Sequence, residues 1–342
     1  MLTGVNNDFT KWTLSEMSLT NLVHLITIVL IPLLAVVGGI GVVLGPSSFK
    51  LDAKNGHLNQ GLLWLAILLP ISYFFVFGFI AWEGYTIEIS SKGLIKFFEI
   101  SKIPLTFISL ALPLTILVAR FHSTEQTATQ IAITSHKNNL DSFYAHRKEM
   151  FSYFSQLEET DYFGALTAEF KVHPRLHKNF FVGAPNEGIP ELNQVLFKQV
   201  ENTLASARME IDAVLTCNEP ELAFDLYLLN ACVTIHSLSR TLGLREIYQN
   251  VASQGVLLRL TVRGTDDEYL SVGTTTDQLV ASYRYAHDYF QNLCDFAGYT
   301  IEPTPDNHKY IQTGGKFRTI NTPKVIEQLH VNKISRLLQE QV

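Results

Sequence analysis

The chain has 342 residues and a net charge of −6, with 17% charged and 47% hydrophobic residues. This mildly acidic balance gives no support for broad binding to nucleic-acid phosphates, which requires many Lys and Arg side chains. The three cysteines, Cys217, Cys232 and Cys294, lack CxxC spacing, so neither a disulfide framework nor a zinc site is expected. Between Asn21 and Ala119, three long apolar runs contain no Asp, Glu, Lys or Arg.

Those runs predict about three membrane-spanning helices in the first third of the chain. The runs at 21–45 and 61–82 each reach the roughly 20 residues that cross about 30 Å of hydrocarbon as a helix. The run at 103–119 is shorter, but Lys102 and Arg120 flank it, and their long side chains can reach the lipid headgroups. The sequence therefore predicts a multi-pass membrane protein in contact with membrane lipids.

Two kinds of residue in these runs are candidates for a role in helix packing or gating. Glycines let helices approach closely in lipid, and the first run contains a GxxxG pair at its end. Such packing can occur within one chain or between copies in a homo-oligomer. Each run also contains a proline, which removes a helical hydrogen bond and can kink the helix. The candidate residues are Pro32, Gly38, Gly41, Gly45, Pro70 and Pro113.

Charge does not fix the side of the membrane on which the C-terminal part lies. The Lys and Arg residues that flank the runs are balanced between the two sides. Unpaired cysteines are typical of a reducing compartment, so we expect the C-terminal domain to be cytoplasmic. The loop before the third run has apolar residues around 94–100 in a pattern typical of a helix that lies along the membrane surface.

Beyond the membrane region, the sequence predicts a helical stalk at 121–160 and a mostly α-helical soluble domain at 161–342. The stalk contains no proline or glycine, and the apolar residues of its second half recur at spacings of three, four and seven. Strand signals are weak: an alternation at 258–262 and a small β-hairpin around Gly314 and Gly315. The predicted fold class is therefore mainly α.

No motif for catalysis, metal binding or cofactor binding is present, so no such site and no cofactor is predicted. The P-loop, the GxGxxG fingerprint, the HExxH helix and the GxSxG elbow are all missing. His122, His136 and His146 are too far apart along a helix to share a metal ion. His173 and His177 are four residues apart, but no third ligand is evident.

The stretch from Glu99 to Tyr153 has an unusual arrangement of sequence types. A basic-flanked apolar segment, ISKIPLTFISLALPLTILVARFHSTEQT, leads into a polar stalk that reads HKNNLDSFYAHRKEMFSY. The segment VHPRLHKNFF follows at 172–181. Together these segments resemble the transmembrane effector proteins of bacterial retron anti-phage defence systems. The resemblance covers under a quarter of the chain, mainly within 99–181.

The resemblance implies an abortive-infection effector of the bacterial inner membrane. Such a protein works with a reverse transcriptase and its DNA–RNA hybrid product, and it disrupts membrane integrity when released from inhibition. The matching stalk positions would then take part in signalling or packing. They are Arg120, His122, Gln126, Asn139, His146 and Arg147.

Two other functions stay open on the sequence alone. The chain can be a membrane-anchored sensor or scaffold whose cytosolic domain binds a partner without making the membrane leaky. It can also be a membrane-tethered enzyme of unrecognised type, because active sites assemble from residues that are distant in sequence. The favoured hypothesis is the non-enzymatic membrane effector, since it alone accounts for the apolar runs, the stalk and the resemblance together.

Overall fold

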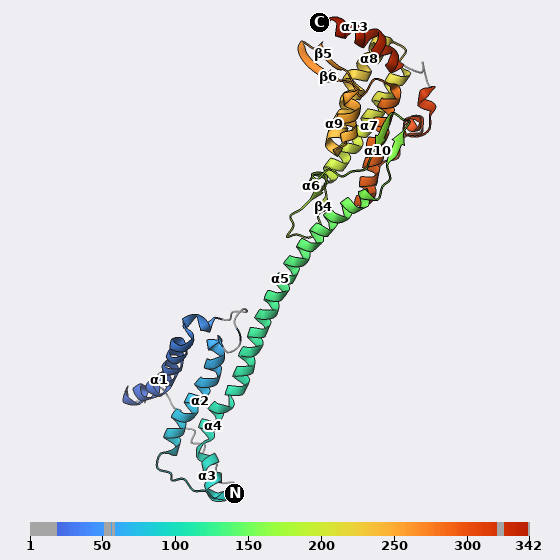
Figure 1. The fold of residues 1–342 in the computed structure, drawn as a ribbon. Coiled ribbons are helices and arrows are strands. Elements are labelled where there is room, and N and C mark those ends of the chain that lie inside the picture. Colours follow the sequence, from blue (N-terminus) through green and yellow to red (C-terminus); the bar gives the residue numbers. More distant parts are fainter. Residues whose placement is uncertain (1–18, 51–55, 57–58, 320–324, 341–342) are drawn as a thin grey trace, which may run out of the picture. The chain divides into compact units, whose positions relative to one another are not determined.

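The computed structural model describes residues 19–50, 56, 59–319 and 325–340. The chain is 72% helical with a few short strands, which confirms the predicted mainly-α class. It divides into two compact units, Met1–Ser135 and His136–Val342 (Figure 1). Helix α5 (Ala111–Ser155) begins in the first unit and ends in the second.

Long apolar helices dominate the first unit. Helices α1 and α2 coincide with the predicted spans at 21–45 and 61–82 to within two residues. The predicted third span, 103–119, is divided at Leu110 into two helices. Pro113 explains the division, because it has no N–H to donate to the carbonyl four residues earlier. The described elements are α1 (Leu19–Leu44), η2 (Pro46–Phe49), α2 (Gly61–Trp82), α3 (Ser91–Ile100), α4 (Lys102–Ser109) and α5.

Helix α2 packs against both α1 and α4. The Tyr73 hydroxyl of α2 donates to the Val29 carbonyl of α1 at 2.8 Å, which provides the partner that a hydroxyl needs away from water. On the α4 side, the Phe77 and Phe107 rings stack with their centroids 4.8 Å apart. Gly61 permits the close approach of α1, since an added Cβ would lie 3.2 Å from the Ile40 side chain.

Among the described residues, four helical segments are long and apolar enough to cross a membrane: Leu22–Leu44, Gly61–Trp82, Lys102–Ser155 and Pro220–Leu242. Of the most apolar part of the first two, only 11% and 17% is buried within the protein. Leaving that much apolar surface in water would be costly, so these helices indicate membrane association. In the fourth segment 50% is buried, and we assign it to the core of the second unit.

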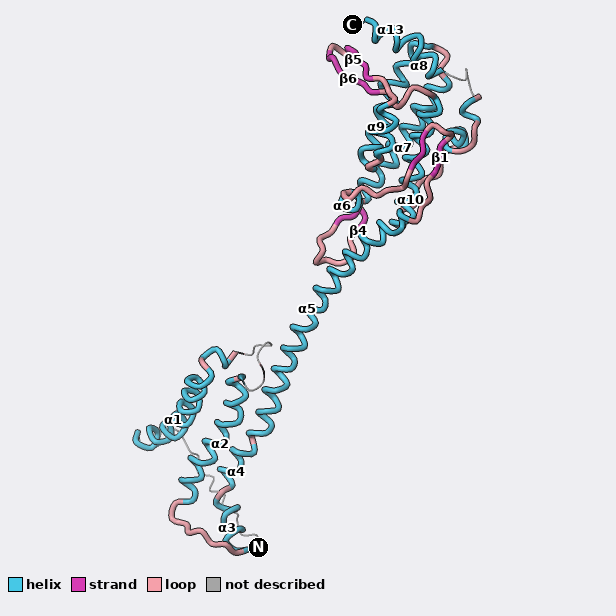
Figure 2. The backbone as a smooth tube through the Cα atoms, viewed as in Figure 1, coloured by secondary structure: helices cyan, strands magenta, loops and turns pink. Residues whose placement is uncertain are grey.

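The second unit is a helical body with three two-stranded antiparallel sheets (Figure 2). Its strands are β1 (Thr160–Tyr162), β2 (Leu166–Ala168), β3 (Phe181–Val182), β4 (Glu191–Leu192), β5 (Leu257–Val262) and β6 (Thr265–Leu270). Its α-helices after α5 are α6 (Leu176–Phe180), α7 (Gln194–Thr216), α8 (Pro220–Asp225), α9 (Val233–Leu242), α10 (Thr276–Ala297), α11 (Lys309–Gln312), α12 (Val325–Leu329) and α13 (Ser335–Glu340). Shorter helical turns are η4 (Leu226–Cys232), η5 (Glu246–Val251), η6 (Asp306–His308), η7 (Lys316–Arg318) and η8 (His330–Ile334).

The β-hairpin lies elsewhere than expected. The alternating residues at 258–262 do form strand β5, which pairs with β6 through a turn at Gly264 with φ +83°. Around Gly314 and Gly315, where the hairpin was expected, the chain forms turns and η7 instead. The carbonyl of Gly314 accepts a hydrogen bond from Arg284, so this segment wraps around a guanidinium rather than pairing as a strand.

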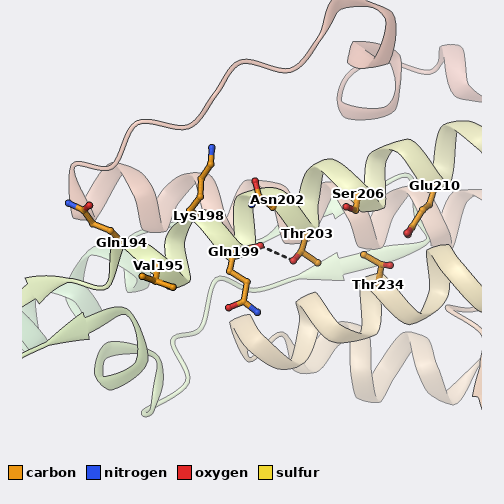
Figure 3. A pocket seen from close by; sticks show the side chains of 9 residues that line it. All are labelled: Gln194, Val195, Lys198, Gln199, Asn202, Thr203, Ser206, Glu210 and Thr234. Atoms are coloured by element: carbon orange, nitrogen blue, oxygen red, sulfur yellow. Dashed lines mark hydrogen bonds between the residues drawn. The ribbon is translucent and has the colours of Figure 1, made fainter.

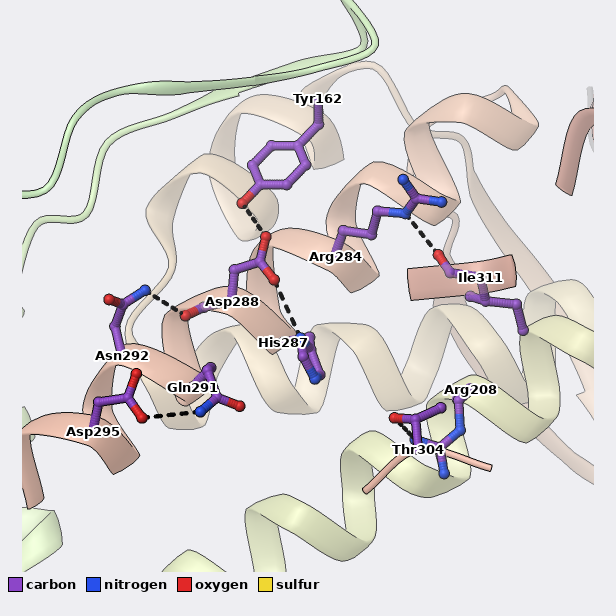
Figure 4. A network of polar contacts seen from close by, with 10 residues as sticks. All are labelled: Tyr162, Arg208, Arg284, His287, Asp288, Gln291, Asn292, Asp295, Thr304 and Ile311. Atoms are coloured by element: carbon purple, nitrogen blue, oxygen red, sulfur yellow. Dashed lines mark hydrogen bonds and ion pairs between the residues drawn. The ribbon is translucent and has the colours of Figure 1, made fainter. Parts of the chain in front are cut away.

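Helix α10 is the central helix of this unit. It starts with a capping box, in which Thr275 and Gln278 satisfy each other's backbone N–H groups. Its buried tyrosines find partners for their hydroxyls: Tyr285 donates to the Glu169 carbonyl at 2.9 Å. Asp288 of α10 accepts from the hydroxyl of Tyr162 in β1 at 2.9 Å, as Figure 4 shows. These bonds fix the β1–β2 hairpin against α10.

Replacing Arg284 by methionine is expected to destabilise the second unit by about 3 kcal/mol, because buried carbonyls would lose a charged donor. The Arg284 guanidinium donates to Ile311 at 2.6 Å and Gly314 at 2.7 Å, and it lies 4.7 Å from the Phe163 ring centroid. Denaturant unfolding of the full-length protein in detergent measures the loss.

Arg318 provides the matched control for this prediction. Its guanidinium also stacks on Phe163, at 5.1 Å, but its side chain is 47% exposed and pairs with Asp277. Exposed ion pairs of this kind contribute about 1 kcal/mol or less, so Arg318→Met is expected to have a small effect. Equal losses in the two variants would show that the carbonyl contacts of Arg284 do not stabilise the unit.

Candidate functional site

The six stalk positions identified in the sequence all lie on α5, but in two separate groups. Arg120, His122 and Gln126 belong to the first unit, where Arg120 is exposed and His122 is 1% exposed. Asn139, His146 and Arg147 belong to the second unit. The three residues of the second group converge on a single segment of the second unit.

Asn139, His146 and Arg147 all bind the segment at 174–186. The Asn139 side-chain amide donates to the Asn186 carbonyl at 2.7 Å. The Nδ1 atom of His146 lies 3.0 Å from Nε2 of His177. The Arg147 guanidinium approaches the Pro174 carbonyl at 3.5 Å. We call these three contacts, together with the residues that make them, the α5 junction.

Helical periodicity explains why these residues share a neighbour. Positions 143, 146 and 147 lie four, seven and eight residues after position 139, which places all of them on the side of the helix that carries Asn139. Further along the same helix, Met150 (0% exposed) and Phe154 (1% exposed) enter the core of the second unit. The apolar end therefore anchors α5, and the polar contacts of the junction follow from that anchoring.

The segment at 174–186, which contacts α5, is packed against the core of the second unit. Leu176 and Phe180 of α6 are buried at 2% and 0% exposure. The short β3–β4 pair closes the loop at 183–190, with Phe181 opposite Leu192. Asn193 caps α7 by accepting from the Leu196 N–H at 3.2 Å. A shift of α5 would therefore be resisted by a packed element rather than by a free loop.

An aromatic cage surrounds the two histidines of the junction. The His146 ring lies 4.7 Å from the Phe181 ring and 5.3 Å from the Phe296 ring, centroid to centroid. Phe143 meets His177 edge-on at 5.7 Å. Burial lowers the pKa of both histidines, and the adjacent His146 and Arg147 charges help to bring that of His177 to about 4. Both rings are thus neutral near pH 7, one donating and the other accepting.

The packing and gating candidates of the membrane region occupy distinct environments. Pro32 and Pro70 are buried within α1 and α2, whereas Pro113 is exposed at the start of α5. Gly38 and Gly41 lie on α1 with no atom within 4 Å of an added Cβ. Their faces are therefore unoccupied by the described chain.

Gly45 has a different place from the other two α1 glycines. It follows the last residue of α1 and has φ +84°, a conformation that glycine adopts far more readily than other residues. Gly45 therefore ends the helix, and the GxxxG pair does not lie on a continuous helical face. The small-residue face of α1 consists of Gly38 and Gly41.

Metal-ligating side chains do not come together in a comparable way in the part of the chain that the structure describes. Within the described residues, no group of three or more His, Cys, Asp or Glu side chains could hold a metal ion. His287 and Asp288 are neighbours on α10, 3.2 Å apart (Figure 4). Asp288 is already engaged by Tyr162, which makes this network a link between β1 and α10.

The comparisons with known proteins give no identification. No family model matches the chain, and no curated protein or solved structure shows significant similarity to it. Function must therefore be argued from the α5 junction and the membrane region themselves.

Sequence reasoning did not find the partners of the junction. The spacing of His177 from His173 and its place in the segment at 172–181 did not predict its contact with His146, 31 residues away. Asn186 and Pro174 contribute backbone carbonyls, which carry no sequence signature at all. The one sequence signal for these contacts was the resemblance to retron effectors, because the stalk and the segment at 172–181 that carry it contact each other at the α5 junction.

Proposed function

We propose that this chain is a membrane effector of an anti-phage system of the retron type, acting at the bacterial inner membrane. Its soluble domain, placed in the cytoplasm, restrains the membrane helices until infection. Release of that restraint makes the membrane leaky and stops growth of the infected cell. A reverse transcriptase and its DNA–RNA hybrid are the proposed partners.

The α5 junction is the observation that carries this proposal. Helix α5, which contains residues 111–119 of the third apolar run, continues without interruption to Ser155 and to the residues that form the junction. A change in the segment at 174–186 therefore acts on the same helix that enters the membrane. The segments of the chain that resemble retron effectors are also the ones that meet at the junction.

The triple variant Asn139→Ala, His146→Ala, Arg147→Ala tests the proposal in bacterial cells. Removing the contacts of α5 should release the restraint, so induced expression is expected to collapse the membrane potential and admit a DNA-binding dye. Asp141→Ala with Lys148→Ala is the matched control, because both side chains are exposed on the same helix. Cells should keep their potential with this control and with the unaltered chain until phage infection. Normal polarisation of infected cells and of cells with the triple variant would refute the proposal.

A groove in the second unit favours the alternative of a membrane-anchored sensor. Figure 3 shows it along α7, with Thr234 of α9 on its opposite side. Its volume is about 780 Å³, and amide and hydroxyl side chains form most of its wall. A sensor would keep its function when the spans were exchanged for an unrelated membrane anchor, whereas an effector that permeabilises the membrane would lose it.

Helix α3 supports the membrane placement on which both functions depend. It connects the ends of α2 and α4, which are tied together where the Trp82 indole N–H donates to the Ser101 hydroxyl at 2.8 Å. Leu94 and Phe98 are 58% and 54% exposed. Lys92, Lys96 and Glu99 occupy the opposite face of this helix by its periodicity. We place α3 in the plane of the lipid headgroups.

Cysteine labelling is expected to show this placement of α3. On a Cys217→Ser background, a fluorophore attached at Leu94→Cys should be quenched by spin-labelled acyl chains in vesicles. The same fluorophore at Lys92→Cys, on the polar face, should be quenched by aqueous iodide instead. Equal quenching of both sites by iodide would place α3 in water and contradict the assignment.

A further inference from the structure

A second cavity lies against α6, on the side away from the α5 junction. It has a volume of about 230 Å³ between α6 and the end of α9. Arg175 and Asn179 line it, and they lie within about 40° of each other on the helix by its periodicity. His177, which contacts α5, points roughly the opposite way on the same helix. The residues lining the cavity are His173, Arg175, Leu176, Asn179, Arg240, Thr241 and Gly243.

The cavity is lined by two guanidinium groups, those of Arg175 and Arg240, and its wall includes no carboxylate. Neither Arg175 nor Arg240 forms an ion pair within the described part of the chain. Nδ1 of His173 accepts from the Arg175 backbone N–H at 3.2 Å, so the neutral ring carries its proton on Nε2 as a further donor. The segment at 170–186 contains no Asp or Glu, so it supplies no carboxylate to neutralise the positive charge of the two arginines.

Gly243 brings the two walls of the cavity together. Its φ is +76°, and a Cβ added there would lie 2.8 Å from the Cβ of His173. The end of α9 can therefore approach α6 this closely only with glycine at this position. The close approach places Arg240, in the last turn of α9, at the same cavity as Arg175.

From this cluster of donors we infer that the cavity binds a phosphate group, carried by a small phosphorylated molecule. Guanidinium groups bind phosphate oxygens through paired hydrogen bonds, and the volume suits one or two phosphate groups rather than a large ligand. Phosphate bound there holds α6 from one face while His177 of the other face contacts α5. The inference concerns a ligand site and does not depend on what the membrane helices do.

Calorimetric titration of the full-length protein in detergent with inorganic pyrophosphate tests this site. One pyrophosphate per chain is expected to bind, and Arg175→Gln and Arg240→Gln should each weaken the affinity at least about tenfold. Lys178→Gln is the control, because Lys178 is an exposed cation on the same helix that does not line the cavity. It should change the affinity less than about twofold.

Matched chloride at equal ionic strength separates specific binding from general screening. A parallel titration with ADP distinguishes the source of the phosphate: tighter binding of ADP assigns a nucleotide, and equal or weaker binding assigns a free phosphate compound. The inference is overturned if neither pyrophosphate nor ADP binds, or if Lys178→Gln weakens binding as much as Arg175→Gln. Circular dichroism of each variant confirms that a loss of binding is not a loss of fold.

Discussion

Isoleucine at position 41 is expected to abolish the membrane leak of the released chain while each monomer still folds. No atom lies within 4 Å of a Cβ added at Gly41, so the larger side chain meets nothing inside the chain. Between copies the effect differs, because small residues let membrane helices approach closely and a β-branched side chain prevents it. Depolarisation in cells that express the triple junction variant, with and without Gly41→Ile, measures this effect.

Two further substitutions make the result interpretable. Val43 is 80% exposed on another face of α1, and Val43→Phe adds as many side-chain heavy atoms as Gly41→Ile. The leak should persist in this variant. Gly61→Ile, by contrast, should impair folding, since its Cβ would lie 2.5 Å from the Ser48 hydroxyl oxygen and 3.1 Å from the Ser48 backbone. A leak that survives Gly41→Ile would show that the Gly38 and Gly41 face plays no part.

Acidification from pH 7 to pH 4 is expected to lower the free energy of unfolding of the second unit by about 3 kcal/mol through His177 alone. His177 is only 3% exposed, and burial lowers the pKa of its imidazole in the folded chain to about 4, from an ordinary value of 6.5. The stabilisation is complete above pH 6.5. It is lost as the pH falls towards 4, because His177 becomes protonated in the unfolded chain while it stays neutral in the folded chain. Burial lowers the pKa of His146 too, so its contribution has the same sign.

Denaturant unfolding at several pH values between 7.5 and 4 measures this dependence. His177→Asn should flatten the slope below pH 6.5, whatever its effect on stability at pH 7. His136→Asn is the control, since His136 lies on α5, the helix of His146, with an exposed side chain. Identical slopes in the wild type and in His177→Asn would show that burial of the histidine pair does not govern acid stability.

The helices of the membrane region could be predicted from sequence because local composition determines them. Apolar runs of sufficient length gave α1 and α2 nearly to the residue, and the missing Gly and Pro beyond Pro113 indicated a long helix. The break at Leu110 was also within reach, since Pro113 removes the hydrogen bond that would have joined α4 to α5. The predicted third span therefore corresponds to α4 and the first turns of α5, which together remain long and apolar enough to cross a membrane.

The junction was beyond the reach of local patterns. Asn139, His146 and Arg147 could be selected through the resemblance, but their partners at 174–186 depend on how α6 and the β3–β4 pair fold back along α5. The incorrect prediction of a hairpin around Gly314 and Gly315 also arose because a long-range contact, which local patterns do not show, determines the structure there. Gly314 and Gly315 suggested a turn between strands, whereas the long-range contact with Arg284 determines what that segment does.

Leakage from reconstituted vesicles tests most directly whether the soluble domain restrains the membrane helices through the α5 junction. Purified full-length protein and its Asn139→Ala, His146→Ala, Arg147→Ala variant would be inserted into vesicles that contain a self-quenching dye. Dye release is predicted to be slow with the unaltered chain and with Asp141→Ala, Lys148→Ala, and fast with the triple variant. Release from vesicles with the triple variant at the rate of protein-free vesicles would contradict the account.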